Sequence, residues 1–402
     1  MWRVNFKNIL LTEIDYKAVT FFLWIVSLFL FCMGFSRQLE YFFAPFVCLF
    51  AFMIVFQNQT KPIGMVRLLL LLLGISFITS YHIFFYYTTK GNILQYICYP
   101  SAALLSSYAM YSYLSCRKKN VLNWLRIFFT IFFAIAVYRF VCSDSLLLLL
   151  NRGWEQNNYF YLVLMPLPIL FINSKSYVNY LYLLICLYVC VCSLKRSALI
   201  SISLVSTAFL FFQFYYSSIS KKIFVIFLGI VCAFFLTSNV YFIQKYEKSI
   251  ERMDRIKTDG GSGRTNIITN FLEDDIYDLT TFPEIFVGNG FESISNKYER
   301  KLAALHNDWL EILYSYGFVG LLLYISFLFK LVVKCFNLFK EKSPFALSAV
   351  VCLILFVVYG FVANVFYFFF YSAPLFLMVG ILDWAEYNLE KRKGISIHKE
   401  RI

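Results

Sequence analysis

The sequence predicts an all-α polytopic membrane protein with about 12 transmembrane helices and one long outer loop that caps an outward-facing cavity. Hydrophobic residues make up 60% of the 402 positions and charged residues only 15%. Apolar runs of about 18 residues or more, enough to cross a bilayer as a helix, recur along the chain. These runs show little alternation of polar and apolar residues, which favours helices over barrel strands.

The apolar runs predict twelve spans, with limits good to a few residues. They lie at residues 18–34, 40–56, 67–86, 93–115, 121–142, 159–172, 177–193, 197–216, 223–243, 309–333, 345–362 and 366–383. The first run follows Arg3, Lys7 and Lys17, and no small-residue cleavage site comes after it. We therefore expect a retained span and not a removed signal peptide. A single transmembrane domain is expected over residues 1–402.

The basic residues indicate how these spans are oriented. The net charge of +13 sits in short clusters between spans, which is a topology signal and argues against a nucleic-acid partner. With both termini cytoplasmic, the inner loops and tails hold 21 Lys and Arg residues, against six in the short outer loops. This asymmetry predicts that the long loop, residues 244–308, lies on the outer side of the membrane.

The long loop carries nearly half of the chain's 23 acidic residues. Residues 245–255 have helix-forming charges and are expected to lie along the membrane surface. A Gly-rich turn at residues 259–264 allows close backbone approach to a ligand. A helix is expected to start within residues 265–272, and another turn is expected at residues 283–290. A loop of this length is too long for a simple connector, which suggests a cap over a cavity.

The sequence gives no sign of a metal or a cofactor. The 11 cysteines include no CxxC pair, and Cys190 and Cys192 lie within one apolar run, so we expect neither disulfides nor a metal site. The acids Glu273–Asp275 and Asp278 are interpreted as solvated surface charges and not as a cation site. Residues 260–263 lack the Gly-Lys-Ser/Thr ending of a phosphate-binding loop. No cofactor and no metal are expected.

His306 is the strongest candidate for chemistry. His398 lies in the charged tail and His82 lies within an expected span, whereas His306 lies where the long loop re-enters the membrane. An imidazole with access to water beside an apolar wall can act as a general base. The alternative interpretation is an interfacial histidine that only caps a helix.

Basic residues on the outer side form a second group of candidates. Lys195 and Arg196 lie between two apolar runs with almost no polar spacer, so they must lie at the tip of a helical hairpin. Arginine offers a planar set of donors that suits phosphate oxygens. The alternative is an arginine that anchors the helix at the interface. Arg152 and Arg264 also face outward, and for each the alternative is a solvated surface charge.

The order of these features resembles the O-antigen polymerase and O-antigen ligase superfamily. The resemblance covers mainly residues 152–333. It rests on the segments Lys195-Arg196-Ser197, Ser262-Gly263-Arg264, Gly288-Asn289-Gly290, His306-Asn307-Asp308-Trp309-Leu310-Glu311 and Gly317-Phe318-Val319-Gly320. The most specific element is the His-Asn-Asp start of a span followed by Gly-x-x-Gly. One departure is that no carboxylate lies three or four residues after His306, since Glu311 is five residues away.

The resemblance implies a metal-independent glycosyltransferase that uses a polyprenyl-diphosphate-linked glycan. His306 would be the catalytic base that deprotonates the acceptor hydroxyl, and Arg196 and Arg264 would bind the diphosphate leaving group. Further substrate contacts would come from Arg152, Asn158, Lys195 and Asn307. The implied location is a bacterial inner membrane with the active site facing the periplasm. The implied partners are the lipid-linked donor and acceptor, membrane lipids and a chain-length regulator protein.

Three functions are compatible with this sequence. The leading expectation is a polymerase that joins lipid-linked repeat units of O-antigen or a related surface polysaccharide. The second is a ligase that transfers the finished chain to a lipid A core. The third is a transporter of lipid-linked sugars, which is less favoured because the polar residues gather in one outer loop and not at the middle of the membrane.

Overall fold

The computed structural model describes most of the chain. The described residues are 15–33, 37–86, 93–116, 121–149, 157–172, 177–216, 238–254, 268–269, 271–275, 282–290, 293, 306–363, 365–366 and 369–393. All regular secondary structure within them is helical. The expectation of an all-α protein is therefore confirmed for this part of the chain. Residues 217–237, which contain most of the expected span 223–243, lie outside the described residues.

The helices follow the apolar runs closely. The longer ones are α1 (Tyr16–Met33), α2 (Arg37–Asn58), α3 (Gly64–Tyr86), α4 (Ile93–Cys116), α5 (Val121–Leu149), α8 (Val178–Cys192), α9 (Arg196–Tyr216), α11 (Val240–Asp254), α15 (Asp308–Lys340), α16 (Ala346–Val362) and α17 (Phe369–Arg392). The shorter ones are α6 (Phe160–Leu164), α7 (Leu167–Leu170), the π-helical turn η3 (Phe271–Asp275) and α13 (Phe282–Val287). Among the described helices, α1, α5, α9, α15 and α17 are long and apolar enough to cross a membrane.

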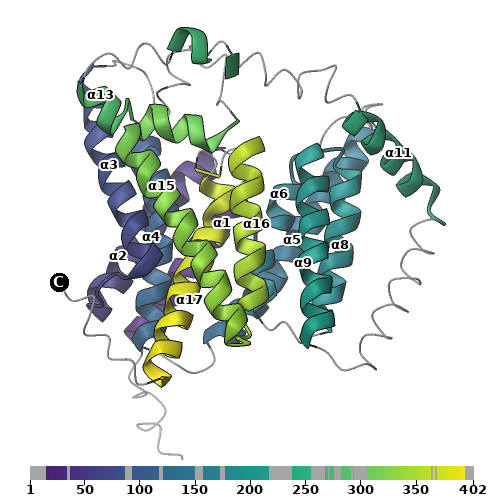
Figure 1. The fold of residues 1–402 in the computed structure, drawn as a ribbon, viewed down its shortest axis with the longest axis horizontal. Helices are drawn as coiled ribbons and strands as arrows, with labels where there is room; N and C mark the ends of the chain where they lie inside the picture. Colours follow the sequence, from purple (N-terminus) through teal and green to yellow (C-terminus); the bar gives the residue numbers. More distant parts are fainter. Residues whose placement is uncertain are drawn as a thin grey trace, which may run out of the picture.

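The helices form one bundle with two groups (Figure 1). The first group contains α1 to α4 together with α15 and α17, where α4 packs against α2 and α17, and α3 packs against α15. The second group contains α5 to α9. Helix α16 packs against α15 of the first group and against α7 and α9 of the second, so it joins the two groups.

The expected span 159–172 does not form one helix. It consists of α6 and α7, separated at Pro166, and Pro168 lies inside α7. Proline has no backbone N–H to donate, and its ring clashes with the preceding turn, so a continuous helix is broken here. Almost every residue from Phe160 to Ile172 is buried in the protein. Such a break is tolerated at membrane depth where neighbouring helices cover the backbone.

Helix α15 is bent at Gly317. Its 33 residues would make a straight rod of about 50 Å, longer than the roughly 30 Å hydrocarbon core of a bilayer. Gly317 has a non-helical backbone with φ 65° and ψ −169°, which divides α15 into an upper limb, Asp308–Tyr316, and a lower limb, residues 317–340. The upper limb lies across the top of the bundle and the lower limb runs down it (Figure 1). The helix expected at residues 309–333 is therefore present within α15, but it is bent and not straight.

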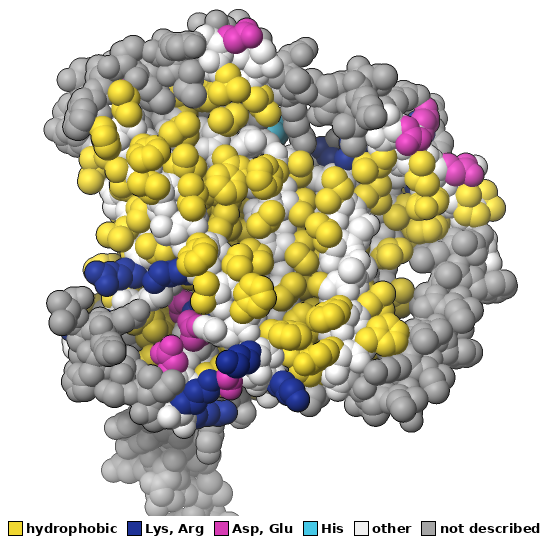
Figure 2. Space-filling view, in the orientation of Figure 1, with side chains coloured by type: hydrophobic (Ala, Val, Ile, Leu, Met, Phe, Trp, Pro, Cys, Tyr) yellow, Lys and Arg dark blue, Asp and Glu magenta, His cyan; other side chains and the backbone are white. Residues whose placement is uncertain are grey.

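The two ends of the bundle differ in character. One end, called here the loop end, holds α11, α13 and the upper limb of α15 (Figure 1). The other, called the basic end, holds the last turns of α15 and α17, with Lys340, Lys391 and Arg392. Figure 2 shows Lys and Arg side chains gathered along this lower edge, below a broad apolar band. The asymmetry follows the charge pattern that predicts a cytoplasmic basic end, and the orientation itself stays a prediction.

Candidate functional site

His306 lies at a tightly defined helix start. Its φ of 55° is a conformation that non-glycine residues adopt at a cost of roughly 1–3 kcal/mol, so the surrounding contacts must hold it. The next residue, Asn307, is the N-cap of α15, and its side-chain oxygen accepts hydrogen bonds from the N–H groups of Trp309 (3.0 Å) and Leu310 (3.2 Å). Asparagine is among the preferred N-caps because it satisfies N–H groups that have no partner within the helix.

Asp308 joins this helix start to a distant part of the chain. Its carboxylate is fully buried and accepts hydrogen bonds from the backbone N–H groups of Val365 (3.1 Å) and Phe366 (3.2 Å). These two residues lie between the end of α16 and the start of α17. The backbone that carries His306 is therefore fixed by Asn307 on one side and by the α16–α17 connection on the other.

The two glycine motifs of the long loop and of α15 meet in space. In a straight helix the carbonyls of Tyr314 and Ser315 accept bonds from residues four positions later, but the bend at Gly317 leaves them open. The N–H of Asn289 donates to the Tyr314 carbonyl at 2.9 Å, and the N–H of Gly290 donates to the Ser315 carbonyl at 2.8 Å. The loop is thereby hydrogen-bonded to the upper limb of α15.

Glycine is required on both sides of this contact. Gly288 and Gly317 both have positive φ, and a Cβ on Gly288 would lie 2.5 Å from the Gly317 nitrogen. A Cβ on Gly317 would lie 2.4 Å from the Phe286 backbone. The expected turn at residues 283–290 is correct only in its last three residues, because α13 occupies Phe282–Val287 first. Proline is compatible with a first helical turn, and Pro283 lies there.

Arg196 lies at the tip of a helical hairpin, as expected. It is the first residue of α9, and α8 ends at Cys192 just before the tip. The Nε of Arg196 donates a hydrogen bond of 2.6 Å to the backbone carbonyl of Arg252 on α11. Lys195 and Arg196 are both half-buried. The arginine thus connects the hairpin tip to the surface helix of the long loop.

Asn158 is held close to the same hairpin tip. Its neighbour Asn157 is buried and donates its backbone N–H to the carbonyl of Ser193 (3.1 Å) and its side-chain amide to the carbonyl of Phe140 (3.2 Å). Asn158 itself is exposed at the start of α6. The structure therefore places Asn158 next to Asn157, which is bonded to the hairpin that carries Lys195 and Arg196, whereas His306, Asn307 and Asp308 lie at the start of α15. Arg152 and Arg264 lie outside the described residues.

Sequence reasoning missed an ionic cluster that anchors α11. The surface helix expected at residues 245–255 exists and begins earlier, at Val240. The buried Lys245 ammonium forms an ion pair with the Asp144 carboxylate of α5 at 3.2 Å, and the Tyr241 hydroxyl donates to the second oxygen of that carboxylate. The Ser249 hydroxyl donates to the Val191 carbonyl at 3.1 Å. An acid inside an apolar run is a signal that could have identified Asp144.

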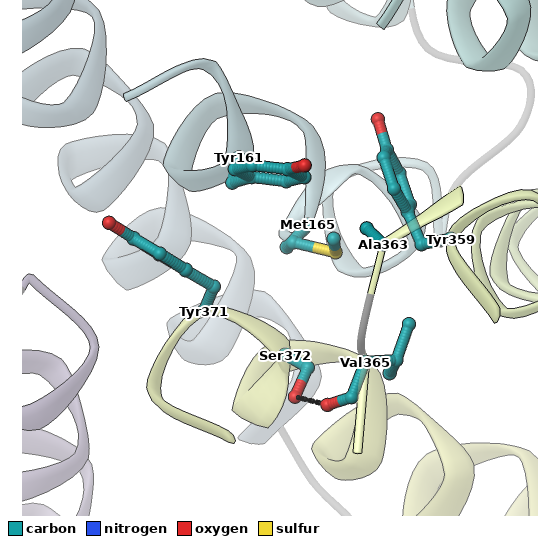
Figure 3. A pocket seen from close by; sticks show the side chains of 7 residues that line it. All are labelled: Tyr161, Met165, Tyr359, Ala363, Val365, Tyr371 and Ser372. Atoms are coloured by element: carbon teal, nitrogen blue, oxygen red, sulfur yellow. Dashed lines mark hydrogen bonds between the residues drawn. The ribbon is translucent and has the colours of Figure 1, made fainter. Parts of the chain in front are cut away.

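A small cavity lies beside the His306 corner (Figure 3). It encloses about 20 Å³ and is lined by Tyr161, Met165, Tyr359, Ala363, Val365, Tyr371 and Ser372. Val365 belongs to both features, because its N–H donates to Asp308 and its carbonyl accepts a 2.7 Å hydrogen bond from the Ser372 hydroxyl. One backbone residue therefore separates the carboxylate that fixes the His306 corner from the aromatic wall of the cavity.

The described part of the chain offers no cluster of three or more His, Cys, Asp or Glu side chains that could hold a metal ion. The ten cysteines within it are free thiols, most of them buried. The acids at residues 273–275 lie in η3, and Asp278 lies outside the described residues.

Comparisons with known proteins give no family: no family model matches the chain, and no curated protein matches it. The function is therefore inferred from the arrangement of the residues. It combines one histidine at a fixed helix start, an arginine at a hairpin tip and a buried carboxylate, all at one end of an apolar bundle.

Proposed function

We propose that this protein is a membrane glycosyltransferase that joins polyprenyl-diphosphate-linked oligosaccharide repeat units into a surface polysaccharide. The observation that carries the proposal is the His306 corner. A half-buried histidine precedes a helix whose start is fixed by Asn307 and Asp308. A general base must be positioned within hydrogen-bond reach of the hydroxyl that it deprotonates, and a fixed backbone favours such positioning.

The leaving group in this reaction is a diphosphate attached to a lipid. As the bond to the sugar breaks, negative charge develops on the diphosphate, and fixed guanidinium groups beside an apolar wall stabilise it. Arg196 is suited to this role because it is half-buried at the loop end and its side chain is oriented through Nε. Arg264 would be the second such group. In this proposal the loop end faces the periplasm.

The transporter alternative is less favoured by the position of the polar groups. Transport sites commonly use broken helices near the middle of the membrane, with polar groups at the break. The broken pair α6 and α7 is instead apolar in sequence and buried. A ligase that transfers the glycan to a lipid A core remains the alternative within the same chemistry, because it would use the same base and the same leaving group.

The decisive experiment is reconstitution of the purified protein with a lipid-linked repeat unit in the presence of EDTA, followed by mass spectrometry. A ladder of longer lipid-linked products is expected, and it should disappear in His306→Ala. Donor that stays intact until a core lipid is added would identify a ligase. Absence of turnover with either acceptor would contradict both transferase functions and favour transport.

The arginine requires a matched control. Arg196→Lys keeps the positive charge and loses the planar donor set, so product formation should fall substantially. The same change also removes the hydrogen bond to the Arg252 carbonyl. Ser249→Ala removes another contact of α11, the bond to Val191, and leaves the arginine in place. Normal activity in Ser249→Ala with loss in Arg196→Lys would support diphosphate binding, and equal loss in both would indicate that only the attachment of α11 matters.

A further inference from the structure

Three of the seven residues that line the cavity beside the His306 corner are tyrosines. Its aromatic residues come from three separate helices: Tyr161 from α6, Tyr359 from α16 and Tyr371 from α17. The rings of Tyr161 and Tyr371 are stacked, with centroids 5.7 Å apart and planes 26° apart. The ring of Tyr359 meets that of Tyr161 edge-on at 5.3 Å. Tyr359 is fully buried, whereas Tyr161 and Tyr371 are partly exposed.

The choice of tyrosine here indicates a ligand with both polar and apolar faces. The neighbouring core is built from phenylalanine, where Phe366, Phe369 and Phe376 pack against one another. A hydrocarbon chain would be bound equally well by phenylalanine. Tyrosine adds a hydroxyl at the end of an apolar ring, which suits ligands that are apolar on one side and polar at the edge. Figure 3 shows the three hydroxyl groups at the outer ends of their rings, away from Val365 and Ser372.

A pyranose sugar ring has this character. Its axial C–H groups give it an apolar face that stacks on an aromatic ring, and its equatorial hydroxyls lie around the edge, where tyrosine hydroxyls can bond to them. Ligand sites typically combine aromatic walls with a few polar groups in this way. The enclosed volume of about 20 Å³ is much smaller than a sugar, so the ring would lie over the partly exposed faces of Tyr161 and Tyr371 and not inside the cavity.

The position of the cavity relative to His306 indicates which sugar of the substrate binds there. Val365 lines the cavity and donates its N–H to Asp308, which lies two residues after His306. We infer that Tyr161 and Tyr371 form the subsite for the sugar of the acceptor, the unit whose hydroxyl is deprotonated at His306. This assignment rests on the proposed function. Asp308 is bonded to Val365 of the cavity and lies two residues after His306, so it aligns the acceptor sugar with the base.

The test uses the full chain in detergent or nanodiscs and two readouts. The first is binding of the free repeat-unit oligosaccharide, released from its lipid, measured by saturation-transfer NMR on the His306→Ala protein, where turnover cannot interfere. The second is the KM for the lipid-linked acceptor in the active protein. Tyr161→Leu and Tyr371→Leu should each weaken binding and raise KM by up to about tenfold, with a smaller effect on kcat. Tyr371→Phe keeps the ring and loses the hydroxyl, so it should weaken binding by a smaller factor than Tyr371→Leu.

Tyr180→Leu is the matched control. Tyr180 is a half-buried tyrosine near the start of α8, away from the hairpin tip, and its ring contacts Phe209. Selective weakening in the two cavity variants supports the subsite. Unchanged binding and KM in both variants would overturn it. Displacement of the bound signal by a long isoprenoid alcohol, with no effect of the oligosaccharide, would also overturn it and assign a hydrocarbon chain to the cavity. Selective weakening in a protein that makes no polymer would support the sugar subsite and contradict the polymerase.

Discussion

Two buried aspartates hold the backbone at opposite ends of the bundle, and they are compensated differently. At the basic end, the Asp383 carboxylate accepts a 2.7 Å hydrogen bond from the Val66 N–H at the start of α3 and forms an ion pair of 2.6 Å with Lys334. Lys334 also pairs with Glu386 at 2.5 Å. At the loop end, Asp308 accepts from two backbone N–H groups, and no Lys or Arg of the described residues forms an ion pair with it.

This difference separates a closed ionic unit at the basic end from the corner where we propose the chemistry. A buried carboxylate that is neutralised by a buried ammonium is a closed unit, and its value lies in joining α3, α15 and α17. Within the described part of the chain, the Asp308 side chain is held only by backbone amide groups and lies two residues after His306, so it fixes the helix start that carries the proposed base. We therefore expect changes at the basic end to affect folding and changes at the loop end to affect activity.

The largest effect is expected from Lys334→Met. This change leaves the buried Asp383 and the half-buried Glu386 without their cation, and breaking one partner of a buried ion pair costs about 3–5 kcal/mol. The yield of folded protein and its thermal midpoint in detergent should both fall steeply. Activity per folded molecule should stay normal. The control is Lys334→Met combined with Asp383→Asn, which removes both charges and should recover part of the stability. If the double variant recovers no stability, packing and not charge determines the stability of the basic end.

Asp308→Ala should have the second largest effect on stability, and the larger effect on activity. It leaves the Val365 and Phe366 N–H groups buried without an acceptor, at about 1–3 kcal/mol for each lost partner. Asp308→Asn keeps one accepting oxygen but turns its NH2 group toward the other N–H, so it should lose less stability than Asp308→Ala. Product formation per folded molecule should fall by about tenfold if the alignment of this helix start supports catalysis. Full activity in Asp308→Asn would show that Asp308 has only a structural role, as Asp383 has at the basic end.

Gly317→Ala tests whether the bend in α15 positions the upper limb. Alanine at φ 65° is strained, and its Cβ would collide with the Phe286 backbone, so we expect a loss of about 2 kcal/mol together with lower activity. Gly74→Ala in α3 is the control, because a Cβ there meets no atom within 4 Å. Hydrogen exchange of Asn289 and Gly290 should increase only in the Gly317 variant. Equal behaviour of the two variants would show that the contact between loop and helix is not important.

The smallest effect is expected from Asn307. Asn307→Ala removes the helix cap and should cost about 1 kcal/mol, whereas Asn307→Asp retains an accepting oxygen and should be close to normal. Thermal unfolding gives the cost, and the polymerisation assay gives the consequence for function. A strong loss of activity in Asn307→Asp at normal stability would show that the side-chain amide contacts the substrate, in contrast to the capping role.

The positions of the helices were largely predictable, because hydropathy acts locally. The expected spans at residues 18–34 and 345–362 coincide closely with α1 and α16. Two departures arose where a local signal was overridden. Pro166 interrupts an apolar run that reads as a span, and the bend at Gly317 depends on its contact with Gly288. The Gly-x-x-Gly pattern includes Gly317, but the pattern alone does not predict that the helix bends there.

The candidate site was predictable in its parts and not in its connections. The hairpin tip and the helix start follow from the sequence around Arg196 and His306. The bond from Asp308 to Val365 joins residues 57 positions apart, and the ion pair between Lys245 and Asp144 joins residues 101 positions apart. Side chains that meet over such separations are brought together by packing of the whole bundle, and no local periodicity encodes them.

The corner in α15 has a consequence for how the protein tolerates different membranes. A single straight helix would carry His306 up or down whenever the bilayer became thicker or thinner, because helices respond to hydrophobic mismatch by tilting. Here the lower limb can tilt about Gly317, while the upper limb stays attached to the Gly288–Gly290 turn and to the α16–α17 connection. We expect this arrangement to keep the height of His306 relative to the lipid headgroups largely independent of bilayer thickness. Changes in lipid chain length should consequently alter helix tilt without displacing the histidine.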